Sequence, residues 1–102
     1  MEEFDITLLS FKGMPMMYVR KNQIVFNAQA AKLIDADFIR VFFDAGNLII
    51  KPDKTGIPLQ KDKKGNCPIM AKPFLQWVKE KGFTTGKYLL TKNEDGYYKA
   101  TA

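Results

Sequence analysis

The sequence contains no histidine and only one cysteine among its 102 residues. Without histidine, neither a histidine-based catalytic dyad nor a histidine metal site can form. Cys67 excludes an intrachain disulfide, has no base partner and precedes Pro68, so we interpret it as an incidental thiol. Glycine-rich phosphate loops of the GxGxxG and GxxxxGK[ST] types are also absent. These absences predict a non-enzymatic protein with no catalytic residues, metal or cofactor.

The chain also lacks a long apolar run. No stretch approaches the roughly 20 apolar residues that span a bilayer. The opening residues, MEEFDITLLSF, alternate in polarity and do not form a basic segment followed by an apolar one. We therefore expect no membrane association and a cytoplasmic location. A length of 102 residues with 46% hydrophobic and 26% charged residues predicts a single globular domain over residues 1–102.

Positive charge is in surplus. The sequence has 16 lysines and arginines against 11 aspartates and glutamates, which gives a net charge of +5. This surplus favours attraction to nucleic acid, anionic lipid or an acidic protein, and composition alone does not choose among them.

Alternation and turn residues divide the chain into hairpins and two short helices. In the first half, Asn27 is a predicted N-cap for a helix over residues 28–34. In the second half, a helix is expected to begin near Pro73, with Phe74, Trp77 and Val78 as its apolar stripe. The predicted segments are an N-terminal hairpin (4–20), a first β-α-β-β unit (22–52), a basic loop (53–66) and a second unit (67–100).

Both units follow the same order of strand, helix, strand, turn and strand. The pattern predicts an α+β fold, a small antiparallel barrel or sheet built from hairpins with two short helices. Identities between the units are almost absent, so internal duplication and chance similarity both stay open.

Residues 22–52, NQIVFNAQAAKLIDADFIRVFFDAGNLIIKP, resemble the AbrB-like, swapped-hairpin family of DNA-binding regulators, which includes the SpoVT and MraZ types. The shared features are a strand that leads into a short polar-capped helix and a hydrophobic hairpin that ends in Ile49-Ile50-Lys51-Pro52. The resemblance implies a barrel in which two such units interlace their hairpins, from two chains or from two repeats in one chain. It also implies double-stranded DNA as the partner.

The resemblance further implies that basic residues around the first helix reach DNA, here Lys32 and Arg40. Together with neighbouring cations, they predict a DNA-binding transcriptional regulator that contacts phosphates. Two structural alternatives stay open: Arg40 as a charge that protects a sheet edge, and the lysines of residues 53–66 as a solvated connection. The predicted phosphate contacts are Arg20, Lys21, Lys32, Arg40, Lys61, Lys63 and Lys64.

A second function of another class fits the same composition. The chain would then be a small protein-binding inhibitor or adaptor, for example a phage or mobile-element protein that blocks a host nuclease such as a CRISPR effector. Its target would be an acidic or nucleic-acid-binding protein. Tyr97 and Tyr98 point to opposite faces of the last strand, so one should be exposed, and both are candidates for a protein interface. The sequence leaves open whether the domain is a homodimer.

Overall fold

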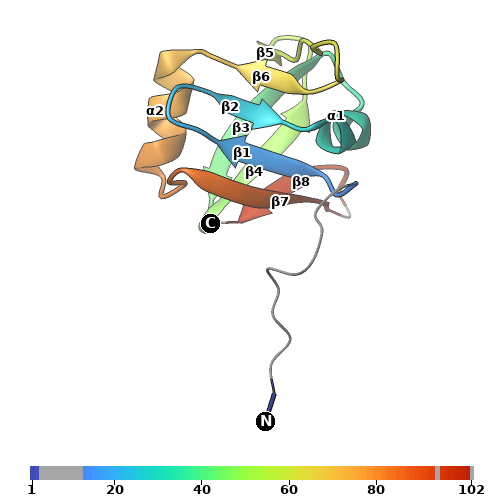
Figure 1. Cartoon of the computed structure of the whole chain (residues 1–102). Coiled ribbons are helices and arrows are strands. Elements are labelled where there is room, and N and C mark those ends of the chain that lie inside the picture. Colours follow the sequence, from blue (N-terminus) through green and yellow to red (C-terminus); the bar gives the residue numbers. More distant parts are fainter. Residues whose placement is uncertain (3–12, 94, 102) are drawn as a thin grey trace.

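The computed structural model describes residues 1–2, 13–93 and 95–101, which form a curled antiparallel sheet with two helices (Figure 1). The strand order is β5-β3-β4-β8-β7-β1-β2-β6. The predicted α+β class of hairpins and two short helices is therefore confirmed. The strands are β1 (Met16–Val19), β2 (Ile24–Phe26), β3 (Phe38–Asp44), β4 (Asn47–Pro52), β5 (Ile57–Pro58), β6 (Cys67–Ile69), β7 (Gly86–Lys92) and β8 (Tyr98–Thr101). The helices are α1 (Ala28–Ile34) and α2 (Lys72–Glu80).

The sheet curls so that one half lies over the other. In Figure 1, β6, β2, β1 and β7 lie in front of β3, β4 and β8, and the two helices lie on opposite sides. The core fills the space between the halves, because alternate strand residues point inward and remove apolar surface from water. Its largest fully buried side chains include Phe26, Phe83, Met17, Ile24, Ile39, Leu48, Ile50 and Leu90.

Asn27 joins the start of α1 to β1. Its Oδ1 atom accepts hydrogen bonds from the backbone N–H groups of Ala30, at 2.8 Å, and of Met16, at 3.0 Å. Its Nδ2 atom donates to the carbonyl oxygen of Met14 at 2.7 Å. The predicted N-cap and the predicted helix over residues 28–34 are both confirmed. One side chain thus caps a helix of only two turns and attaches it to the sheet.

The β3–β4 hairpin is also present, as the turn residues Asp44-Ala45-Gly46-Asn47 predict from the sequence. Ala45 and Gly46 form a two-residue loop with φ angles of 50° and 83°, so both residues are left-handed, as in a type I′ turn. The loop places Asp44 opposite Asn47 and determines the register of the whole hairpin.

Residues 53–66 contain more structure than the predicted loop. Ile57 and Pro58 form β5 and pair with the start of β3, while Leu59 is buried. Asp62 Oδ1 accepts from the N–H groups of Lys64 and Asn66, both at 2.9 Å, which orders the turn before β6. A strand of two residues has no detectable period, so the sequence could not reveal β5.

The apolar stripe predicted for α2 is confirmed at Val78 but omitted Leu75, the other buried residue of the helix. Leu75 and Val78 face the core, whereas Phe74 and Trp77 are half-buried and stack with a ring-centroid distance of 6.4 Å. Neither of the helices in the described residues has the length and apolar character needed to cross a bilayer. The first strand of the predicted hairpin over residues 4–20 lies outside the described residues, and the return strand, β1, pairs with β2 and β7.

Candidate nucleic-acid interface

The outer face of β3, β4 and β8 gathers basic and aromatic side chains. The strand register places Arg40 opposite Lys51, and Ile49 between Phe42 on one side and Lys99 on the other. Their neighbours Ile39, Leu48, Ile50 and Ala100 are buried, so alternation directs this set outward. We call the set the basic sheet face, and it consists of Arg40, Phe42, Ile49, Lys51, Tyr97 and Lys99.

Lys51 is the centre of the basic sheet face. Its Nζ atom lies 4.1 Å from the ring centroid of Tyr97 and 5.0 Å from that of Phe42. The guanidinium carbon of Arg40 lies 5.7 Å from the Phe42 centroid. These distances are within the range of cation–π contacts, which hold a charge at a ring while leaving it accessible to solvent. The two rings therefore position the cations and do not neutralise them.

Asp53 is the acidic neighbour of this face. Its Oδ1 atom accepts from the hydroxyl and the backbone N–H of Thr55, at 2.7 and 2.8 Å, and its Oδ2 atom lies 3.8 Å from Arg40 Nη1. These Thr55 hydrogen bonds, with a smaller contribution from Arg40, lower the pKa of the Asp53 carboxyl. The ion pair is long and exposed, so it leaves Arg40 free to exchange Asp53 for another anion.

The seven predicted phosphate contacts do not form one surface. Arg20 stacks over Tyr18 at 5.5 Å, in the turn after β1, on the side of the molecule where α2 lies. Lys32 is exposed on α1, on the opposite side (Figure 1). Arg40 belongs to the basic sheet face. The fold thus separates cations that the sequence had grouped around the first helix.

The loop lysines lie beside α1. Asn66 Oδ1 accepts a hydrogen bond from the backbone N–H of Ala28 at 2.9 Å, which brings the turn of residues 62–66 against the start of the helix. The exposed residues Lys61, Lys63 and Lys64 are therefore on the same side of the molecule as Lys32.

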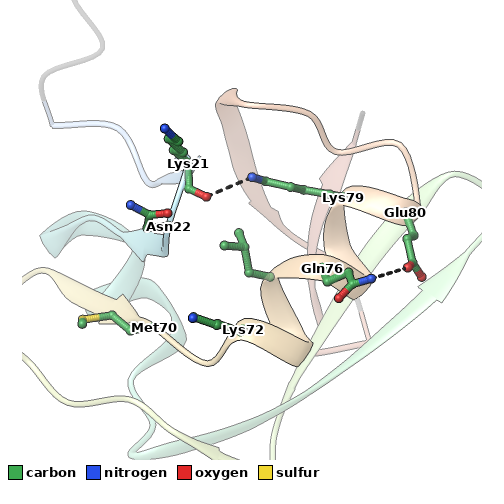
Figure 2. A pocket seen from close by; sticks show the side chains of 8 residues that line it. Lys21, Asn22, Met70, Lys72, Gln76, Lys79 and Glu80 are labelled. Atoms are coloured by element: carbon green, nitrogen blue, oxygen red, sulfur yellow. Dashed lines mark hydrogen bonds between the residues drawn. The ribbon is translucent and has the colours of Figure 1, made fainter.

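Lys21 lines a separate basic pocket of about 860 Å³ beside α2 (Figure 2). Lys79 Nζ donates to the carbonyl oxygen of Lys21 at 3.1 Å, and Lys72 points toward the side where Asn22 lies. Glu80 is held by Gln76 Nε2 at 3.2 Å on the other side of the helix from Asn22. We call this the α2 pocket. Three lysines and one glutamate among its lining residues favour an anion as its occupant.

The structure corrects the prediction for Tyr98. Its side chain is 6% exposed and its hydroxyl lies 3.4 Å from the carbonyl oxygen of Ile34, so it packs in the core and offers no surface to a partner. Tyr97 is the half-exposed member of the pair and belongs to the basic sheet face.

Two important cations were missed by sequence reasoning. Lys51 could have been found, because the two-residue loop between Asp44 and Asn47 places it opposite Arg40. Lys99 could not, because it joins the face through the pairing of β4 with β8, which are distant in sequence.

Metal binding and thiol chemistry are the other two possibilities that the described residues address. No three histidine, cysteine, aspartate or glutamate side chains come together there in a way that would hold a metal ion. Cys67 is buried, and this burial raises the pKa of its thiol, which disfavours the reactive thiolate.

Comparisons with known proteins gave no relative. No protein-family model, no curated protein and no solved structure matches the chain.

Proposed function

We propose that this chain is a non-enzymatic DNA-binding domain that contacts phosphates through the basic sheet face and acts as a transcriptional regulator. The observation that carries the proposal is the position of Lys51, between the rings of Phe42 and Tyr97 and opposite Arg40. Cations interleaved with partly exposed aromatic rings on a sheet are typical of nucleic-acid surfaces.

The distribution of charge over the sheet supports the proposal. A surface that attracts phosphates needs cations without nearby carboxylates, because acidic residues would repel the backbone. Acidic residues in the described chain are concentrated in turns and at strand or helix ends. Within the described strands, the cations are Arg40, Lys51, Lys87, Lys92 and Lys99, and the acidic residue is Asp44.

The strand pairings support a swapped-hairpin barrel made from two repeated units. Consider exchanging β1 with β5, β2 with β6, β3 with β7 and β4 with β8. The exchange converts β1–β7 into β3–β5 and β3–β4 into β7–β8, and it leaves β2–β6 and β4–β8 unchanged, so β1–β2 is the one observed pairing without an observed counterpart. The counterpart of that pair, β5–β6, would join the two ends of the described sheet. We infer a duplicated β-β-α-β-β unit, which is one β1-like strand longer than the repeat expected from the sequence.

The other predicted cations have a secondary role in this proposal. Lys32 and the lysines of the 61–64 turn would contact flanking phosphates beside α1. Lys21 would act at the α2 pocket, on the opposite side, with Arg20 next to it in the chain. Each group adds sequence-independent attraction, and the basic sheet face provides the main contact.

Fluorescence anisotropy of a labelled random duplex tests the proposal. At physiological salt we expect a Kd of about 1–100 µM that tightens steeply as salt is lowered, because each bound cation releases counterions from the phosphates. The double variant Lys51→Ala/Lys99→Ala should bind more weakly, with a salt slope lower by about 0.9 for each lost contact. A single strand of the same composition measures the stacking contribution of Phe42 and Tyr97.

Lys87→Ala is the matched control. Lys87 is an exposed strand lysine, whereas Lys51 and Lys99 are half-buried, and it pairs with Tyr18 of β1 in the other half of the sheet, so its loss should change binding little. Absence of binding at low salt would contradict the proposal. Equal effects of Lys87→Ala and of either lysine of the basic sheet face would reassign the contact surface.

The second candidate function is that of a protein-binding inhibitor or adaptor, directed at an acidic or nucleic-acid-binding protein. It is favoured by Phe42 and Phe43, which are 40% and 38% exposed next to a groove beside α2. Two results together would support this function instead. The chain should fail to bind DNA at low salt, and it should bind a protein through an interaction that Phe43→Ala abolishes.

A further inference from the structure

The α2 pocket has the dimensions of a small-molecule site. Its volume is about 860 Å³, and it lies between α2 and the turn of residues 20–23 that joins β1 to β2 (Figure 2). Pockets that bind small organic ligands have volumes of about 300–1,000 Å³. The α2 pocket can therefore hold an organic molecule and not only a single inorganic ion.

The pocket is open because the turn beside α2 is short. The strand exchange that relates the two repeated units makes α1 the counterpart of α2, and residues 59–66 the counterpart of residues 20–23. The longer connection packs against the start of α1, where Asn66 Oδ1 accepts a hydrogen bond from the first N–H group of the helix at 2.9 Å. The shorter one reaches α2 through Lys79 Nζ, which donates to the carbonyl oxygen of Lys21 at 3.1 Å. Too few residues remain to fill the space beside α2.

Positive charge in the pocket is not neutralised. Lys21, Lys72 and Lys79 line it, and none of them makes an ion pair with a carboxylate in the part of the chain that the structure describes. The hydrogen-bond partner of Lys79 is a neutral carbonyl group, so the charge of its ammonium group is retained. Glu80, the acidic residue of the lining, lies on the other side of the helix from Asn22 (Figure 2). An anionic group is therefore the complement of this pocket.

The lining also contains apolar side chains and an amide with no partner among the described residues. Leu75 is 7% exposed and belongs to the core, whereas Met70, which also lines the pocket, is 69% exposed. The side-chain amide of Asn22 makes no hydrogen bond with the described residues. Figure 2 shows Asn22 and Met70 on one side of the pocket, with Lys72 pointing toward them. The pocket thus combines cations, an apolar wall and an amide that can both donate and accept hydrogen bonds.

We propose that the α2 pocket binds a nucleoside phosphate, with the phosphate beside Lys72 and Lys79 and the base against Met70 and Leu75. Lysine ammonium groups bind phosphate oxygens as compact point charges. A methionine sulfur makes favourable contacts with an aromatic ring. The Asn22 amide supplies a donor and an acceptor, the pair that matches the edge of a base such as adenine.

A nucleoside phosphate uses the whole lining, whereas simpler ligands use part of it. Inorganic phosphate would contact the lysines and leave Met70 exposed to water. An acyl chain would cover the Asn22 amide without a hydrogen bond, which costs free energy. A free nucleotide and the 5′-phosphorylated end of a nucleic-acid strand share the required chemistry, and the experiment below distinguishes them.

The α2 pocket is separate from the basic sheet face. Arg40, Lys51 and Lys99 do not line it, so the inference does not rest on the proposed function. Of the pocket's lysines, the proposed function uses Lys21 alone, as a flanking phosphate contact. Nucleotide binding and duplex binding can therefore be lost separately.

Isothermal titration calorimetry of the full chain with AMP tests the proposal. We expect one AMP per chain, bound more tightly than adenosine or inorganic phosphate, because each of these makes only part of the contacts. Lys72→Ala should weaken AMP binding about tenfold or more, as expected for a lost hydrogen bond to a charged group. Met70→Ala should weaken it about 2–10-fold and leave the binding of inorganic phosphate unchanged.

Lys32→Ala is the matched control. Lys32 is also an exposed helix lysine, but it lies on α1, on the opposite side of the molecule, so its loss should leave AMP binding unchanged. Equal losses in Lys32→Ala and Lys72→Ala, or inorganic phosphate that binds as tightly as AMP, would overturn the proposal. All three substituted side chains are exposed, and thermal denaturation checks that each variant folds.

A short single strand with a 5′-phosphate, compared with the same strand with a 5′-hydroxyl, identifies the source of the nucleotide. The comparison uses the Lys51→Ala/Lys99→Ala variant, which weakens any contribution from the basic sheet face. A phosphorylated strand that binds more tightly than both AMP and the hydroxyl strand points to a strand end, and tighter binding of AMP points to a free nucleotide. A chain that binds neither AMP nor the phosphorylated strand rejects this proposal alone, whereas AMP binding without duplex binding rejects the proposed function alone.

Discussion

At the scale of single residues, tight turns determine how neighbouring strands meet. Ala45 has a φ angle of 50° in the β3–β4 loop, a left-handed conformation that glycine and asparagine adopt with less strain. The following Gly46 has a φ of 83°. This turn sets the register that places Arg40 opposite Lys51. The basic sheet face therefore depends on a turn in which one alanine has a strained backbone.

Replacing Ala45 should stabilise the protein. Ala45→Gly or Ala45→Asn removes the strain of a left-handed alanine and should raise the free energy of unfolding by about 0.5–1 kcal/mol. Urea denaturation measures the change. Gly46→Ala introduces a left-handed alanine at the next position. The added Cβ atom would have no neighbour within 4 Å, so the backbone strain alone should lower the free energy of unfolding by a similar amount. A loss of stability in both Ala45 variants would contradict the turn geometry.

At the scale of elements, the short strand β5 depends on a close backbone approach. Gly56 precedes β5, and a Cβ atom built on it would lie 2.0 Å from the carbonyl oxygen of Ile39 in β3. No other residue can occupy this position without displacing β5 from β3. β5 can therefore pair with β3 only because position 56 has no side chain.

Gly56→Ala should lower the free energy of unfolding by about 1–3 kcal/mol, because the added methyl overlaps a backbone atom that cannot move alone. Gly86→Ala is the matched control, since its nearest neighbour would be 3.9 Å away and its φ angle is not positive. Thermal denaturation of both variants makes the comparison. A neutral Gly56→Ala would show that the β4–β5 connection moves freely away from β3.

At the scale of the whole molecule, the curled sheet encloses the thiol of Cys67. Cys67, on β6, is completely buried in the shared core. Burial raises the pKa of its thiol, nearby Asp62 adds to the increase, and Lys61 opposes it. Deprotonation of this thiol is therefore coupled to unfolding of the entire domain.

This coupling predicts a loss of stability in alkaline solution. The folded pKa of Cys67 lies above the unfolded value, near 9.0, so the unfolded chain gives up its proton first. The thiol's contribution is fully present below that pH, and the free energy of unfolding should fall as pH rises through and above it. Chemical denaturation over this range, with Cys67→Ala as reference, isolates the contribution. Parallel pH profiles for both proteins would contradict it.

Much of the local structure could be predicted from the sequence. Asn27 marked the start of α1, and the two-residue loop at Ala45 and Gly46 marked the β3–β4 hairpin, because capping and turn geometry involve residues only a few positions apart. The predicted stripe of α2 was right at Val78, which is buried, but it missed Leu75. Phe74 and Trp77 are apolar enough to suggest fully buried positions, yet they are only partly buried against the core.

The sequence by itself determined the two helices, the β3–β4 and β7–β8 hairpins and the surplus of positive charge, since each depends on side-chain chemistry and short-range backbone geometry. Only the tertiary structure decided which cations share a surface. The pairing of β4 with β8 brought Lys99 beside Ile49, and the curl of the sheet placed Lys32 and Lys21 on opposite sides. Tyr98 was buried and Tyr97 left partly exposed by the same pairing, because in a strand a shift of one residue exchanges core for solvent.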